Sequence, residues 1–387
     1  MFTICSISCA GYGNGLPLEY FRRDEMHMLV AQGDTPYTNE AGTAFGITTT
    51  QAVLSHTVAD FTLHHEKQYA DPQWQDLLSM AAVKYYMPDD HEWGGDNYDH
   101  TLTQANAGNS PVGGIGATTQ ADVDLHWWNG VQAVQAQVAL RYDNVANADA
   151  EAIAEKPSNA AAGTPASQYP VRYFRQGFDV NGNVVTVNPH VEIFVIDCMS
   201  YRSPISATDN ASKTMLGANQ KAWLKAHLLS SAANFKLIFS GKKTYKQTSS
   251  DNTDTWGEYT TERNEILDYI AAQSITGIAW LAGDKHVPQV MEHHISDGDT
   301  YDHICICACP IHVGINGWAA TPNITWHGNT QVYGRFVVDV NRVNLSVVSA
   351  NNGEELWRGF IVPTSNQVYY DEQHLSAMNI QELACND

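Results

Sequence analysis

Residues 88–99 bring together the residue types that bind metal ions. Within twelve positions the stretch holds five acids, one histidine, one asparagine and a Gly-Gly pair. Carboxylate and amide oxygens bind hard divalent cations, and imidazole nitrogen suits transition metals. The adjacent glycines let the backbone turn so that several side chains can converge. Taken alone, the stretch fits a solvated acidic loop equally well, so its interpretation depends on whether similar residues recur elsewhere.

Similar residues do recur, each time at the end of a short apolar run. Six such runs are too short and too continuous for amphipathic helices, and we predict that they are buried strands. They span residues 1–9, 26–32, 81–87, 191–196, 235–239 and 277–282. In α/β sheets the carboxyl ends of the strands hold the binding site. We therefore predict an α/β fold in which separate strands deliver polar residues to one place.

The residues at these strand ends supply every ligand type that a two-metal site requires. Such a site needs a carboxylate between two ions about 3.5–4 Å apart, further oxygen and nitrogen ligands, and an open position for water. Singly, a Gly-Asp pair after a strand is commonly a turn, and a buried cysteine is commonly a core residue. Together the residues favour a metal site. The candidates are Cys9, Asp34, Tyr37, Asp89, Asp90, His91, Asp96, Asn97, Asp284 and His286.

The remaining patterns fill in the elements around these strands. Apolar residues at helical spacing predict helices over 213–230 and 261–273. Period-two patterns predict strands over 303–309 and 335–349, the latter a hairpin around Asn341 and Arg342. On the first of these strands Cys305, Cys307 and Cys309 alternate with apolar residues, so we interpret them as core rather than as a soft-metal site. Residues 127–142 are a candidate helix.

The charge of the chain favours cations as partners. Asp and Glu number 42 against 21 Lys and Arg, which gives a formal net charge of -21. A surface this negative repels nucleic-acid phosphates and anionic membranes over about 8 Å in physiological salt. An anionic substrate would need local positive charge, which bound metal can supply.

Cysteine use and the start of the chain bear on location. The seven cysteines have no small-domain spacing, which argues against a disulfide framework and favours a reducing compartment. No apolar stretch reaches the ~18 residues that span a bilayer, and the first residues read as a strand rather than a signal peptide. We expect a cytoplasmic location ahead of export or a viral source.

Several motifs, in order along the chain, resemble those of the calcineurin-like metallophosphoesterases, and within them the PhoD-like alkaline phosphatase and phosphodiesterase branch. The resemblance runs from Ser8 to about Ile361. Its motifs are Ser8-Cys9, Gly33-Asp34-x-x-Tyr37, Asp89-Asp90-His91-Glu92 with Asn97, Asp197-x-x-x-Tyr201-Arg202, Met215-Leu216-Gly217-x-x-Gln220-x-x-Trp223-Leu224 and Gly283-Asp284-x-His286.

The resemblance implies a four-layer α/β/β/α sandwich, with two mixed β-sheets and the metals at the strand ends between them. It implies Fe3+ held by Cys9 and Tyr37, with Asp34 bridging to Ca2+. Asp284 and His286 would complete the cluster, and Asp89, Asp90 and Asp96 would supply further calcium ligands or phosphate contacts. The same ligands could take Mn2+, Zn2+ or Mg2+ instead.

The activity implied is hydrolysis of small phosphate monoesters or diesters by a metal-bound hydroxide. His91, Asp90 and Asn97 are the expected catalytic residues beside the metals. Two alternatives remain open: a phosphodiesterase that acts on nucleic acid or phospholipid, and a non-catalytic calcium-binding relative.

Phosphate binding departs from the family pattern. The family usually has an arginine shortly before the Asp-Asp-His-Glu motif, whereas this chain has His64 and His65 there. We expect these histidines or Arg202 to bind the phosphate group, although Arg202 could instead form a structural ion pair with Asp197. Substrate binding through a histidine would weaken as pH rises through its pKa.

We expect one catalytic domain over 1–362 with a surface excursion at about 100–168, and a segment 363–387 that could cap the active site.

Overall fold

The computed structural model describes residues 1–10, 15–38, 57–93, 123, 126–134, 173–245, 254–293, 301–311 and 324–371. Three of the expectations above therefore fall outside the described residues. These are the positions of Asp96 and Asn97, most of the surface excursion at 100–168, and residues 372–387 of the candidate cap.

The first β-sheet combines a parallel half with an antiparallel half. Its strand order is β14-β13-β12-β1-β2-β3. Strands β1, β2 and β3 run parallel, so their carboxyl ends lie at one edge of the sheet, whereas β12, β13 and β14 pair antiparallel. The strands are β1 (Phe2–Ile7), β2 (Met26–Gln32), β3 (Val83–Met87), β12 (Val332–Val338), β13 (Val343–Ser349) and β14 (Glu355–Ile361).

The second β-sheet is built around four parallel strands. Its order is β11-β9-β10-β8-β7-β6-β4-β5, in which β10, β8, β7 and β6 are parallel neighbours. The strands are β4 (Phe174–Phe178), β5 (Val184–Val185), β6 (Val191–Val195), β7 (Phe235–Gly241), β8 (Ile278–Ala282), β9 (Gln289–His293), β10 (His303–Cys307) and β11 (Ile324–His327). Every residue of β6, β7 and β8 is buried, as expected for parallel strands covered on both faces.

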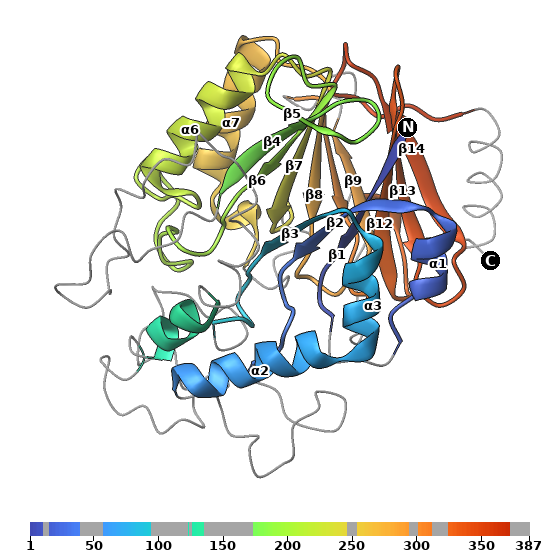
Figure 1. Cartoon of the computed structure of the whole chain (residues 1–387). Helices are drawn as coiled ribbons and strands as arrows, with labels where there is room; N and C mark the ends of the chain where they lie inside the picture. The colour runs from blue at the N-terminus through green and yellow to red at the C-terminus, as the bar shows by residue number, and fades with distance from the viewer. Residues whose placement is uncertain are drawn as a thin grey trace, which may run out of the picture.

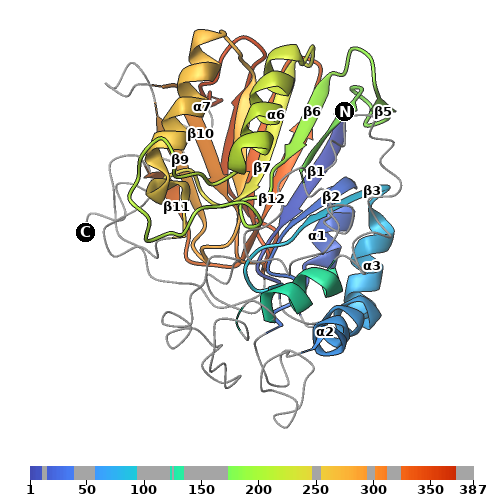
Figure 2. The same cartoon turned by 90° about the vertical axis from the view of Figure 1, so that its left-hand side faces the viewer.

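Helices cover the outer face of each sheet. Figures 1 and 2 show α1 (Leu18–Arg23), α2 (Val58–Ala70) and α3 (Pro72–Met80) on the side of the first sheet, and α6 (Gly217–Ser230) and α7 (Thr260–Ala272) on the side of the second. One apolar core lies between the sheets, where the rings of Phe239 and Phe336 are 6.4 Å apart, and a further core lies under each set of helices. The predicted four-layer α/β/β/α sandwich is confirmed.

Local signals account for the helix boundaries. A reciprocal capping box between Thr57 and Asp60 begins α2, and the Asp71 carboxylate caps α3 ahead of Pro72. Such caps satisfy backbone N–H groups that have no partner within the helix. All six predicted strands and both predicted helices are present, and residues 127–134 of the candidate helix at 127–142 are helical. Among the described residues, none of the helices combines the length and apolarity needed to cross a bilayer.

The core between the sheets should dominate the stability of the fold. We predict that Leu237→Ala lowers the free energy of unfolding by about 3 kcal/mol, because it removes buried methyl groups and leaves a cavity. Leu237 is fully buried in β7. Urea denaturation of the variant measures the change. The control Val187→Ala, at a side chain that is 73% exposed, should change stability by less than about 0.5 kcal/mol; equal effects would contradict the assignment of the core.

Candidate metal centre

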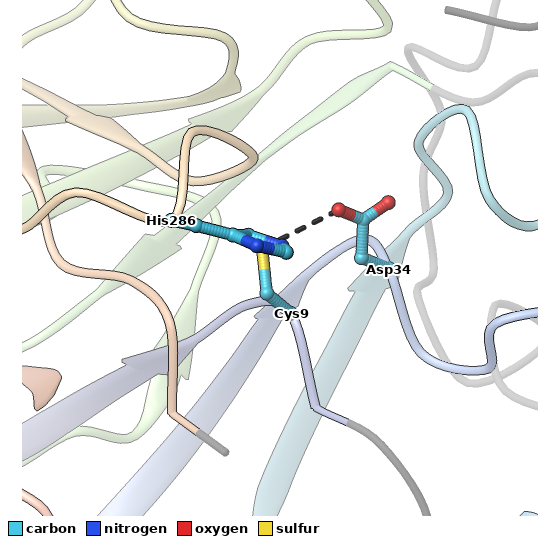
Figure 3. A group of neighbouring side chains, drawn as sticks. All are labelled: Cys9, Asp34 and His286. Carbon is cyan, nitrogen blue, oxygen red and sulfur yellow. Dashed lines mark hydrogen bonds between the residues drawn. The ribbon is translucent and has the colours of Figure 1, made fainter. Parts of the chain in front are cut away.

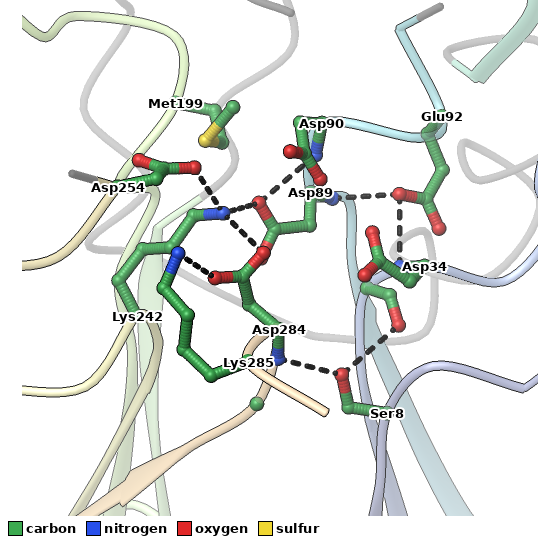
Figure 4. A network of polar contacts seen from close by, with 12 residues as sticks. Ser8, Asp34, Asp89, Asp90, Glu92, Met199, Lys242, Asp254, Asp284 and Lys285 are labelled. Carbon is green, nitrogen blue, oxygen red and sulfur yellow. Dashed lines mark hydrogen bonds and ion pairs between the residues drawn. The ribbon is translucent and has the colours of Figure 1, made fainter. Parts of the chain in front are cut away.

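The candidate site lies where strands from both sheets end. Asp34 follows β2, Asp89 follows β3, Lys242 follows β7 and Asp284 follows β8, and their side chains point toward one another in Figure 4. Ser8, at the end of β1, holds these turns together: its hydroxyl accepts the Asp284 N–H at 3.2 Å and donates to the Gly33 carbonyl at 3.4 Å. Two sheets thus contribute to one polar centre.

The backbone is strained where it presents these side chains. Among the described residues, seven non-glycine residues have positive φ, and four of them belong to the site: Cys9, Asp34, Asp284 and His286. Such conformations are costly for residues with a side chain and cluster at functional sites. Gly33, with φ of +80°, has no room for a side chain because an added Cβ would lie 2.4 Å from the Cβ of Asp89.

A first cluster of potential ligands consists of Cys9, Asp34 and His286 (Figure 3), whose ligand atoms lie within 4.8 Å of one another. The Cys9 thiol lies 3.3 Å from Asp34 Oδ2. The buried Tyr37 phenol adjoins this cluster, with its Oη 2.8 Å from Nε2 of His286. Thiolate, imidazole, phenolate and carboxylate together suit a transition metal.

The charges of this first cluster favour a thiolate. Burial raises the pKa of Cys9, but hydrogen bonding with Cys309 and the positive charge of His286 together lower it well below its ordinary value. Burial lowers the pKa of His286, but the adjacent Cys9 and Asp284 outweigh burial and raise it to about 9. These shifts favour a thiolate beside an imidazolium, and metal binding at His286 would then have to release the imidazolium proton.

Two further clusters adjoin the first. One consists of Asp34, Asp90 and His91, and the other of Asp89, Asp90, Asp254 and Asp284. Asp34 belongs to the first two clusters, which is the position of a bridging carboxylate in a two-metal site. The ring of His91 packs against Tyr37 with centroids 4.1 Å apart, which connects the first cluster to the second.

The unsatisfied oxygen of Asp34 fits a metal ion. Its Oδ1 atom is buried and has no hydrogen-bond partner among the described residues, although buried oxygens normally have one. Burial raises the pKa of Asp34 well above its usual range, and the negative charges of Cys9 and Asp90 raise it further. A cation at this position would relieve both the missing partner and the repulsion, so the residues present fit a metal ion.

The third cluster already contains cations of the chain (Figure 4). Lys242 Nζ lies 2.5 Å from Asp89 Oδ1, 2.6 Å from Asp254 Oδ2 and 2.9 Å from Asp284 Oδ1. Lys285 Nζ lies 2.9 Å from the other oxygen of Asp284, and Arg202 forms an ion pair with Asp254. Burial lowers the pKa of Lys242, but the surrounding carboxylates outweigh it and raise the pKa well above its ordinary value.

Glu92 holds the two ligand-bearing turns of the first sheet in place. Its fully buried carboxylate accepts the N–H groups of Asp34 at 3.0 Å and of Asp89 at 2.8 Å, together with that of Thr35. It also accepts the hydroxyl of Tyr86 at 2.8 Å. The Asp34 and Asp89 side chains are thus oriented by a carboxylate whose own oxygens are engaged.

Comparison with known proteins identifies the family. A model described as PhoD-like phosphatase matches residues 2–311. The chain belongs to the PhoD-like phosphatase family.

One curated relative and two solved structures are also similar to this chain. Alkaline phosphatase D of Bacillus subtilis (strain 168) is 22% identical in an alignment of 316 residues that covers 76% of this chain and 47% of the relative. The chain therefore spans about half the length of that curated relative. The structure of PhoD superposes with a TM-score of 0.64 at 16% identity, over 94% of this chain and 70% of that one. Purple acid phosphatase PPD1 from yellow lupin (Lupinus luteus) seeds gives 0.54 at 7% identity, over 93% and 53%. Both superpositions show a shared fold.

The structure brings together most of the site residues predicted for this PhoD-like chain. Eight lie in or beside the three clusters: Cys9, Asp34, Tyr37, Asp89, Asp90, His91, Asp284 and His286. Asp284 faces Lys242 and Lys285 rather than completing the cluster of Cys9. Asp96 and Asn97 lie outside the described residues, so their roles stay predictions.

Of the predicted phosphate-binding residues, the two histidines lie away from the three clusters, and Arg202 has a different partner from the one expected. His64 and His65 are buried in α2 and belong to none of the clusters in the described part of the chain. Burial lowers the pKa of His64 to about 4, so any weakening of binding through this ring would occur near pH 4. The expected ion pair between Arg202 and Asp197 is wrong: Arg202 pairs with Asp254. Asp197 instead accepts the N–H groups of Met199 and Ser200 within its own turn.

Sequence reasoning missed several contributors to the site. Lys242 was visible as a strand-end residue, but no pattern in the sequence indicated its partners. Asp254 precedes a 3-10 helix, η4 (Trp256–Glu258), and follows no strand. The core assignment of Cys307 and Cys309 is correct in that both are buried, yet they also border the site: Cys309 contacts Cys9, and the Cys307 thiol donates to the Gly283 carbonyl at 3.3 Å.

The support by Glu92 gives a test of this geometry. We predict that Glu92→Gln destabilises the protein by about 2 kcal/mol, because an amide NH2 group replaces one oxygen that accepts two hydrogen bonds and leaves these donors without their acceptor. Metal content should fall as well, since Asp34 and Asp89 lose their common support. Thermal unfolding and elemental analysis measure the two effects. Glu19→Gln, at an exposed position of α1, is the control, and metal content unchanged in both variants would contradict the supporting role.

Proposed function

We propose that this PhoD-like chain is a metal-dependent hydrolase of small phosphate monoesters or diesters. The observation that carries the proposal is a pair of buried ligand clusters that share Asp34, in a member of the PhoD-like phosphatase family. The net charge of -21 supports a small substrate over a nucleic acid, because no excess of basic residues is available to neutralise a polymer of phosphates.

We assign each cluster a metal by the chemistry of its donors. Cys9, Tyr37, His286 and Asp34 would hold Fe3+, because thiolate and phenolate donors match a transition metal. Asp34 and Asp90 would hold Ca2+, with Mn2+, Zn2+ or Mg2+ as alternatives, because both supply hard oxygen donors. Asn97 and Asp96 remain proposed as further contributors to the second position.

The residues of the chain would bind and orient the phosphate ester. Bound metal ions would lower the pKa of a water molecule and neutralise charge on the phosphoryl oxygens. His91, oriented by its contact with Tyr37, would donate a hydrogen bond to a phosphoryl oxygen. Stabilisation of this developing charge is the main catalytic contribution in phosphoryl transfer.

The thiolate gives a spectroscopic test of the first metal position. We predict about one iron per chain in protein purified without chelators, and a broad visible absorption band from thiolate or phenolate bound to Fe3+. Cys9→Ser should remove most of this band and most of the iron. Cys5→Ser is a matched control in β1, the strand that leads to Cys9, because Cys5 is equally buried but belongs to the core beneath the helices. If Cys9→Ser kept the band and the iron content of the wild type, the assignment of iron to Cys9 would be wrong.

Asp34 tests whether the two positions are coupled. We predict that Asp34→Asn reduces phosphate-ester hydrolysis at least ~100-fold and lowers the content of both metals, because one side chain serves both clusters. Hydrolysis of a chromogenic phosphate ester and elemental analysis provide the measurements. A variant with full activity and metal content would contradict the bridging role. A wild-type protein without bound metal or hydrolysis, even after metals are added, would favour a non-catalytic relative.

A further inference from the structure

Lys242 occupies the centre of the third cluster. Its side chain is fully buried, and its ammonium meets carboxylates from three separate segments of the chain (Figure 4). Asp89 follows β3 of the first sheet, Asp284 follows β8 of the second, and Asp254 lies just before η4. An ammonium group has three N–H donors, so one lysine can serve all three carboxylates.

The oxygens of this cluster are already engaged by cations of the chain. Lys242 and Lys285 contact the two different oxygens of Asp284. Lys242 and Arg202 likewise contact the two different oxygens of Asp254. A calcium ion would need six to eight oxygen ligands at about 2.3–2.6 Å, and these oxygens face ammonium and guanidinium groups instead. Asp254 Oδ2 and Asp284 Oδ2 also lack a hydrogen bond of good geometry, but each lies within ion-pair distance of an ammonium, whereas Asp34 Oδ1 has neither kind of partner among the described residues.

Cations of the chain compensate most of the formal charge of the third cluster. Its four carboxylates carry four negative charges, and Lys242, Lys285 and Arg202, which pair with Asp89, Asp254 and Asp284, carry three positive charges. Buried charges are tolerated when they are paired in this way.

We propose that Lys242 is a resident cation of this site. Its ammonium occupies the place between Asp89, Asp254 and Asp284 that a metal ion would otherwise take, so that the metals are confined to the two clusters that share Asp34. The inference rests on the proposed metal centre. It makes Lys242 a positioning residue, which joins Asp89 of the first sheet to Asp284 of the second without a metal.

Removal of Lys242 should open the third cluster to a metal ion. We predict that Lys242→Ala, equilibrated with CaCl2 and then passed through a desalting column, retains about one more calcium per chain than the wild type. In chelator its Tm should fall by about 5 °C, because three buried carboxylates lose their common partner. Added calcium should raise the Tm of Lys242→Ala back toward that of the wild type. Elemental analysis and thermal unfolding are both independent of enzyme activity.

Lys236→Ala is the matched control. Lys236 is also buried and also lies in β7, but its ammonium donates to the carbonyls of Ala233 at 2.7 Å and Thr276 at 3.2 Å. This variant should lose stability without gaining calcium. Equal calcium content and equal calcium dependence of the Tm in Lys242→Ala and the wild type would overturn the proposal.

A measurement on the wild type decides the question if Lys242→Ala does not fold. Crystals of the whole chain grown with MnCl2 should show anomalous scattering at the clusters that contain Asp34 and none between Asp89, Asp254 and Asp284. A peak between these three carboxylates in an active enzyme would overturn this inference and leave the proposed function intact. Absence of metal from every cluster, together with absence of hydrolysis, would overturn both.

Discussion

The carboxylate of Glu92 is the constraint on which the site geometry depends. It is buried between the turns that follow β2 and β3, and it binds the backbone N–H groups of both Asp34 and Asp89. Hydrogen bonds to a charged acceptor contribute about 1.5–3 kcal/mol each, which offsets part of the cost of burying the charge. Because Glu92 accepts through both oxygens, it fixes the ligands without acting as one. The two turns therefore present their carboxylates toward the second sheet.

That arrangement concentrates negative charge. Basic side chains offset part of this charge around Asp254, whereas Asp34 lies among other negative groups. Although burial raises the pKa of Asp254, the charges of Arg202 and Lys242 hold it well below its usual range. Burial raises the pKa of Asp34, and neighbouring negative charges raise it further instead of opposing the effect. The pKa of Asp89 is also raised, because burial outweighs the opposing charge of Lys242. Lys242 and Arg202 therefore stabilise the charged form of Asp254 in particular, whereas burial and neighbouring negative charges both oppose ionisation of Asp34.

Much of the fold could be predicted because its buried strands are continuous apolar runs whose polar residues follow immediately. The same pattern located eight of the ten predicted strand-end ligands within one described centre. Helices α2 and α3 were not predicted, although the Thr57–Asp60 pair and Asp71 before Pro72 are sequence signals for helix starts. The partners of Lys242 and Arg202 could not be predicted. The pair of Lys242 with Asp89 joins the two sheets, the pair with Asp284 joins the ends of neighbouring strands β7 and β8, and the pairs of Lys242 and Arg202 with Asp254 reach the segment before η4. No local spacing in the sequence encodes these contacts.

The division of the site also bears on how one chain could bind unlike metals side by side. Cys9, Tyr37 and His286 supply sulfur, phenol oxygen and nitrogen on one side of Asp34, and Asp90 and His91 lie on the other. Selectivity among divalent and trivalent ions follows ligand type and geometry more than raw affinity. A third vacancy lined only by carboxylates would bind hard cations nonspecifically and compete for Asp90, which belongs to two clusters. A lysine at its centre removes that competition, because a covalently attached ammonium cannot be exchanged for another ion.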